Sequence, residues 1–92
     1  MISVRALGHA ETVLGAREVR LEVGEGAFVD ELLEKADSFT DGGLRDILYV
    51  DGKRNEWVRV LLNGRDVRFL PEEKLCLKEY DVVHIIPALG GG

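Results

Sequence analysis

Residues 57–69, WVRVLLNGRDVRF, have the pattern of a β-hairpin. Apolar side chains stand at every second position from Val58 to Leu62, as in a strand that buries one face. Asn63-Gly64 follows at once, and this dipeptide is the strongest short-range signal for a tight hairpin turn. We therefore expect a strand over 57–62, a turn at Asn63-Gly64 and a returning strand over 65–69.

Three other segments predict strands that complete a sheet around this hairpin. Residues 2–7 and 18–23 alternate between apolar and polar side chains, which indicates one buried face in each. Residues 82–86, VVHII, are almost continuously apolar and are followed by Pro87, which suits a central strand that ends there. The chain is thus expected to form a mixed sheet of four to five strands.

Residues 28–39 hold the one clear helical pattern. The apolar residues that recur there at helical spacing are Phe28, Val29, Leu32, Leu33, Ala36 and Phe39. Segment 44–49 fits a short helix and an irregular packed segment equally well, 9–14 shows no clear period, and 50–56 is expected to be an exposed turn. The order of elements predicts an α+β fold in which the sheet packs on one main helix.

Composition argues against several classes of function. The chain has 92 residues with a net charge of −5, and its Lys and Arg residues are scattered singly, so no basic stripe is present to bind nucleic acid. No stretch approaches the ~20 apolar residues of a membrane span, and MISVRAL is unlike a secretory signal. We expect a single cytoplasmic domain that binds neither nucleic acid nor membrane.

No group of residues has the pattern of a catalytic or metal site. His9 and His84 have no acidic or cysteine partner at ligand spacing, so we predict no metal and no bound cofactor. Cys76, between two leucines, is expected to behave as a small buried apolar residue, with a reactive thiol as the alternative. The protein is therefore not expected to be an enzyme.

The C-terminal residues 84–92, HIIPALGGG, suggest a different function. We expect residues 1–87 to be the folded domain and 88–92 to be a flexible tail, in which Leu89 leads to Gly90, Gly91 and Gly92. Such a tail enters a narrow channel that a side chain would block, and brings only the Gly92 carboxylate to its end. If an enzyme adenylates that carboxylate, it becomes an acyl electrophile. Plain flexibility is the alternative explanation of the glycines.

The element order, the Leu62-Asn63-Gly64 hairpin, the segment 80–87 (YDVVHIIP) and the terminal glycines together resemble the ubiquitin-like β-grasp sulfur carriers of the MoaD/ThiS kind. The likeness is greatest to the small subunit of molybdopterin synthase. It implies that an E1-like adenylating enzyme uses ATP to activate Gly92 and that a sulfurtransferase persulfide converts it to a thiocarboxylate. The large synthase subunit would then receive the sulfur for molybdopterin, the ligand of molybdenum or tungsten.

Related branches that this resemblance leaves open serve thiamine synthesis, transfer-RNA thiolation or conjugation to lysines of other proteins. The tail departs from the synthase pattern in one respect. Pro87 matches, but the second proline is missing, and Leu89 with a third glycine looks closer to a ubiquitin-like tail. This departure favours conjugation or service to several pathways.

Strand parity predicts where a partner would dock. If the apolar positions of the strands face the helix, then Arg59, Leu61, His84 and Ile86 face away from it, joined by Leu7. With Pro87 these residues form the expected partner-binding site, and isolated surface apolar residues are the alternative. The net negative charge of the chain favours partners with basic surfaces.

Overall fold

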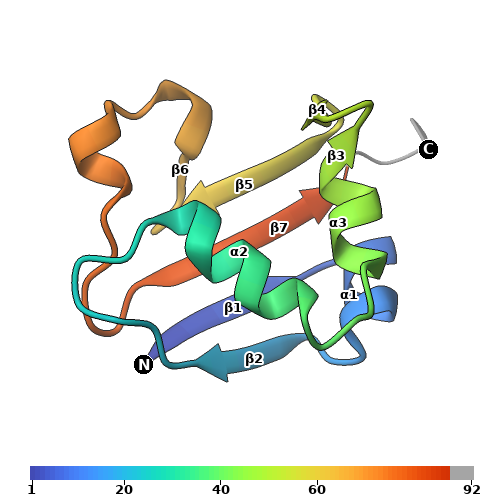
Figure 1. Ribbon diagram of the computed structural model, residues 1–92, viewed down its shortest axis with the longest axis horizontal. Helices are drawn as coiled ribbons and strands as arrows, with labels where there is room; N and C mark the ends of the chain where they lie inside the picture. Colours follow the sequence, from blue (N-terminus) through green and yellow to red (C-terminus); the bar gives the residue numbers. More distant parts are fainter. Residues whose placement is uncertain (88–92) are drawn as a thin grey trace.

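A five-stranded mixed sheet forms one layer of the molecule, and helix α2 crosses one of its faces (Figure 1). The structure is a computed structural model and describes residues 1–87. The order across the sheet is β2-β1-β7-β5-β6. The strands are β1 (Ile2–Ala6), β2 (Glu18–Leu21), β5 (Val58–Leu62), β6 (Arg65–Asp66) and β7 (Val82–Pro87).

Strand β7 occupies the centre of the sheet. It runs parallel to β1, where Val4 pairs with Val83, and antiparallel to β5, where Val60 pairs with Ile85. The continuously apolar sequence VVHII therefore forms the central strand that it predicted. The Asn63-Gly64 turn is also confirmed, because both residues have positive φ values, 50° and 89°, as a tight turn between β5 and β6 requires.

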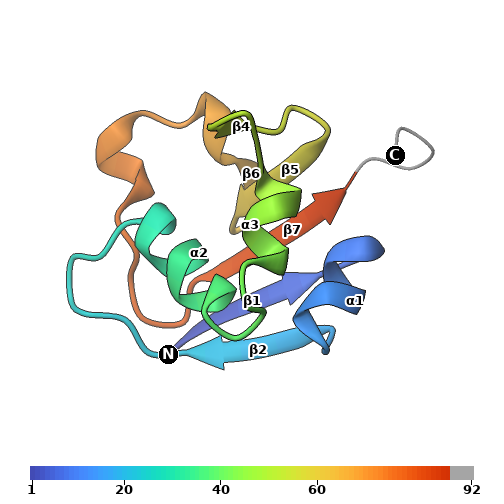
Figure 2. The same ribbon diagram turned by 45° about the vertical axis from the view of Figure 1, so that its right-hand side comes forward.

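Three α-helices accompany the sheet within residues 1–87: α1 (His9–Leu14), α2 (Val29–Asp37) and α3 (Gly43–Leu48). Figure 2 shows α2 and α3 over the same side of the sheet and α1 near the end at which β7 finishes. The expected α+β fold, a β-grasp sheet packed on one main helix, is confirmed. The helix at 43–48 resolves the alternative that the sequence left open for 44–49, and α1 is a helix that the sequence did not indicate.

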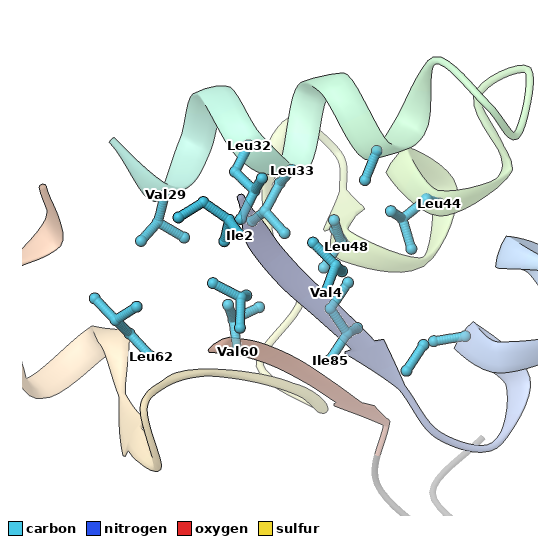
Figure 3. Packing of buried hydrophobic residues seen from close by; sticks show 14 of the residues in the cluster. Ile2, Val4, Val29, Leu32, Leu33, Leu44, Leu48, Val60, Leu62 and Ile85 are labelled. Atoms are coloured by element: carbon cyan, nitrogen blue, oxygen red, sulfur yellow. The ribbon is translucent and has the colours of Figure 1, made fainter. Parts of the chain in front are cut away.

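The core lies between α2, α3 and the inner face of the sheet (Figure 3). Leu32 on α2, Leu44 on α3 and Val83 on β7 are each 0% exposed. The inward parity of the strands is as predicted, since alternate residues of β1, β5 and β7 are buried. Burial of these apolar side chains is the main favourable contribution to the stability of the sheet and helices.

Helix α2 ends earlier than its apolar pattern predicted. Ser38 is its C-terminal cap, and Phe39, expected on the buried face, is 66% exposed because it stands in the turn after the helix. Phe28, also expected on that face, is the N-cap residue and is 41% exposed. Its backbone N–H donates to the Glu31 carboxylate at 3.3 Å, so capping comes from within the first turn.

Two loop regions also differ from the prediction. Residues 50–56 are not a simple turn, because Tyr49–Val50 (β3) and Lys53–Arg54 (β4) form a separate two-stranded sheet around Asp51-Gly52. The strand expected over 65–69 stops at Asp66, whose Oδ1 accepts a hydrogen bond from Arg68 N at 2.9 Å and caps the 3-10 helix η1 (Val67–Phe69). A second 3-10 helix, η2, spans Glu72–Leu75.

Candidate functional site

The side of the sheet that faces away from α2 carries the residues predicted to bind a partner. The register places Arg5 of β1 beside His84 of β7, and His84 opposite Leu61 of β5. In the next row, Ile86 of β7 lies opposite Arg59 of β5. We call this surface the open face; with neighbours of the same parity it comprises Ser3, Arg5, Glu18, Arg20, Arg59, Leu61, Asp66, Val82, His84 and Ile86.

Apolar and basic groups alternate on the open face. Leu61 and Ile86 are half-buried, and Arg59 is exposed. Leu7, directly after β1, is 45% exposed, and its backbone N–H donates to the carbonyl of Ile85 at 3.1 Å. This bond places the backbone of Leu7 beside the end of β7, next to the row of Ile86 and Arg59. Trp57, directly before β5, adds a large side chain that is 65% exposed.

The carboxylates of this side are already engaged by arginines. Glu18 accepts a hydrogen bond from Arg5 Nε at 2.6 Å and lies 3.5 Å from Arg20 Nε. This hydrogen bond from Arg5, with the charge of Arg20, lowers the pKa of Glu18, so its carboxylate is ionised at neutral pH. Asp66 likewise pairs with Arg68 at 2.9 Å, and the hydrogen bond lowers the pKa of Asp66.

Two polar groups of the open face stand without such a partner. Within residues 1–87, His84 Nδ1 is shielded from solvent and has no hydrogen bond. Arg59 is exposed and forms no ion pair in the same part of the chain. The exposed Arg59 guanidinium remains available to another molecule, whereas Arg5 and Arg68 are held by carboxylates of this chain.

The described chain ends at Pro87, which lies opposite Val58 at the far end of β7. Helix α1 contacts β7 and lies near this end in Figures 1 and 2. Pro87 is half-buried, and it adjoins Ile86 of the open face. The predicted tail residues Leu89, Gly90, Gly91 and Gly92 lie outside the described residues.

Other surfaces show less. A hollow of about 110 Å³ lies between α2 and α3, with Asp30, Asp37 and Arg45 in its wall. In residues 1–87 no three His, Cys, Asp or Glu side chains are grouped so as to hold a metal ion. Among the helices described, none has the length and apolar character to cross a membrane. Cys76 was expected to be buried, and the structure shows it half-buried.

Sequence reasoning missed the contacts between strands that set the charge of the open face. Glu18 was not singled out, although it holds Arg5 and Arg20 together. The pairing of Arg5 with Glu18 follows from the antiparallel register of β1 and β2. The alternation in residues 2–7 and 18–23 was the available signal, but it fixes only the face of each residue and not its neighbour across the strands.

Comparison with known proteins agrees with this fold. The chain matches the ThiS family over residues 4–92. It is 30% identical to small archaeal modifier protein 3 of Haloferax volcanii over 91 residues, which are 99% of this chain and 98% of the relative.

Two solved structures are similar over nearly their whole length. The BexX/CysO complex of Amycolatopsis orientalis contains a chain that is 27% identical, with complete coverage of both chains and a TM-score of 0.80. A Pyrococcus furiosus protein provisionally assigned as molybdopterin converting factor, subunit 1, is 25% identical, covers 96% of this chain and 97% of its own, and gives a TM-score of 0.75.

The sequence match and these neighbours agree with the β-grasp sheet and with the resemblance drawn from the hairpin and the glycines. Members of this group are small carrier or modifier proteins and in general not catalysts. One similar chain was solved in a complex with another protein, the BexX/CysO complex. The chain belongs to the ThiS family, the ubiquitin-like sulfur carriers and protein modifiers.

Proposed function

We propose that this protein carries sulfur on its C-terminal glycine, Gly92, as a thiocarboxylate. The observation that supports this function best is the path of β7, which passes along the open face and ends at Pro87, only five residues in sequence before Gly92. A partner docked on the open face would hold the start of the tail while the glycines reach the active site of the partner. The match to the ThiS family, which extends to residue 92, supports the same assignment.

The chemistry requires three steps. A carboxylate oxygen of Gly92 attacks the α-phosphorus of ATP on an E1-like adenylating enzyme, and pyrophosphate leaves. The outer sulfur of a sulfurtransferase persulfide then attacks the acyl carbon, and AMP leaves. A thiol reduces the resulting acyl disulfide, giving the thiocarboxylate and a new disulfide. ATP is bound by the adenylating enzyme and not by this chain.

For the pathway, we propose molybdopterin synthesis in the cytoplasm, where the large subunit of molybdopterin synthase takes up the sulfur. The similarity to the Pyrococcus furiosus protein provisionally assigned as molybdopterin converting factor, subunit 1, supports this choice. Pro87 agrees with it, because the synthase tails resembled by this sequence also begin with a proline.

Conjugation to lysines of other proteins is the second candidate function. The observation in its favour is the 30% identity to small archaeal modifier protein 3 across 99% of this chain. Leu89 and the third glycine, which look closer to a ubiquitin-like tail, favour it too. Both functions share the adenylate of Gly92 and differ in the nucleophile that captures it, a persulfide sulfur or a lysine amine.

Intact mass spectrometry of the protein purified from its native host tests the two functions. Replacement of one carboxylate oxygen by sulfur is the result expected of the carrier. Glycine remnants on lysines of other proteins, after digestion, are the result expected of the modifier. If the mass shows an unmodified carboxylate under sulfur-replete growth and no remnants are present, both proposals are wrong.

A further inference from the structure

The two sides of this acidic protein differ in charge. Exposed carboxylates gather on the helices, where α2 carries Asp30, Glu31 and Glu34 and η2 carries Glu72 and Glu73. The open face instead carries Arg5, Arg20 and Arg59 on three neighbouring or nearby strands. The net charge of −5 therefore describes the helical side and does not describe the open face.

The carboxylates on the open face do not cancel this positive charge. Glu18 is shared by Arg5 and Arg20, so one negative charge faces two positive charges. Asp66 is occupied by Arg68, which itself lies beside the face. Arg59 forms no ion pair within residues 1–87, although its charge also contributes to the lowered pKa of Asp66. The open face is thus a basic surface on an acidic molecule.

The surroundings of Arg59 determine what kind of surface can cover it. Its row neighbour is Ile86, and the side chain two positions along β5, Leu61, shares its face. A partner that buries these apolar side chains also takes the Arg59 guanidinium out of water. Burial of an unpaired charge is costly, so a stable complex needs an acceptor for it.

We propose that the partner surface that docks on the open face is acidic as well as apolar, with a carboxylate that pairs with Arg59 beside the start of the tail. This inference rests on the proposed function, and it gives the activating enzyme's docking surface its chemistry. It reverses the expectation from net charge, which pointed to basic partner surfaces. The acidic helices face away and would be repelled by the same surface, so the charge distribution also selects the orientation of docking.

Steady-state kinetics of the adenylating enzyme from the same organism test the proposal, with pyrophosphate release as the readout. In Arg59→Glu the KM for the carrier should rise about tenfold or more at low salt with kcat unchanged, because encounter and docking weaken but chemistry at Gly92 does not. Arg59→Lys should stay within about twofold of wild type since it keeps the charge. Lys74→Glu on η2 is the matched control, an exposed residue with the same change in net charge, and should leave KM unaltered.

The dependence of KM on salt is a second readout, and its sign should differ between the wild-type protein and Arg59→Glu. Added salt should raise the KM of the wild-type protein, by screening attraction, and lower that of Arg59→Glu, by screening repulsion. Replacing the contacting enzyme carboxylate by lysine should restore activation of Arg59→Glu. Equal KM values for wild type and Arg59→Glu, or equal increases in Arg59→Glu and Lys74→Glu, would overturn the acidic-partner inference while leaving the carrier function intact. If the wild-type chain is not adenylated at all, the proposed function fails and the inference fails with it.

Discussion

The side-chain amide of Asn63 donates a hydrogen bond to Asp81 Oδ1 at 2.9 Å, and this bond ties the turn after β5 to the residue before β7. Asn63 Oδ1 also accepts from the backbone N–H of Val82 at 2.9 Å. Asp81 in turn accepts from Lys78 N at 2.8 Å through its other oxygen. The strand that leads to the tail is therefore fixed at its first residue by the side chain of Asn63, which Asp81 holds in place.

Asn63→Ala should destabilise the protein by about 1–3 kcal/mol, because it removes both side-chain bonds and places alanine at a φ of 50°. Asn63→Gly should cost less, since glycine adopts that φ without strain but lacks the same bonds. Urea unfolding of the two variants measures the difference. Equal losses would show that backbone strain contributes nothing, and no loss in either would show that the bonds to Asp81 and Val82 do not stabilise the fold.

The approach of α1 to α3 makes a second prediction. A Cβ on Gly43 would lie 2.9 Å from Val13 Cγ1, closer than side chains tolerate. Gly43→Ala should therefore lower the free energy of unfolding by about 1 kcal/mol, the overpacking being partly offset by the better helix propensity of alanine. A double-mutant cycle with Val13→Ala should show coupling, because the second change makes room for the methyl group. Additive effects of the two substitutions would show that Gly43→Ala does not destabilise the protein through contact with Val13.

The Asp66–Arg68 pair predicts a dependence of stability on pH. The hydrogen bond from Arg68 lowers the pKa of Asp66 in the folded state, so the ionised carboxylate stabilises the fold above the ordinary Asp pKa of about 3.9. This stabilisation is lost as the pH falls through the lowered value. Wild type should exceed Asp66→Asn in unfolding free energy at neutral pH, and the difference should shrink as acid is added. A constant difference between the two proteins from neutral to acid pH would contradict the assignment.

Removal of Gly91 and Gly92 separates the fold from its function. The truncated chain keeps all residues that the structure describes, so its unfolding midpoint should equal that of wild type within error. Adenylation by the partner enzyme should be abolished, because the carboxylate no longer reaches the activating site. Normal pyrophosphate release with the truncated chain would disprove the role of the tail.

The sequence predicted the sheet better than the connections. Alternation over 57–62 predicted β5 because burial of one face imposes a period of two, and the apolar run at 82–86 predicted β7 because a short apolar run that ends at a proline is typical of a strand. Helix α1 was missed since its buried residues are only Ala10 and Leu14, too few to show a period in six residues. Phe39 was misplaced because helical spacing continued past the point where Ser38 ends the helix.

The residues of the candidate site were predictable from the sequence, but the charge of the site was not. Period two alone places Arg59, Leu61, His84 and Ile86 on one face, and the register confirms it. The charge of Glu18, in contrast, is balanced by an arginine from its own strand and one from β1. Strand parity does not predict which residues pair between strands, so this contact was not predictable. Net charge sums the whole surface, so it does not describe the charge of this part of it.

The central position of β7 has a consequence for the order in which the protein forms during synthesis. Both ladders that join the two halves of the sheet, β1 with β7 and β5 with β7, need residues 82–87. A nascent chain that lacks them leaves β1–β2 and β5–β6 as separate two-stranded pairs, and such pairs are marginally stable by themselves. The fold therefore closes only when the segment leading to the glycines has left the ribosome, and an incomplete chain has no open face for an activating enzyme to bind.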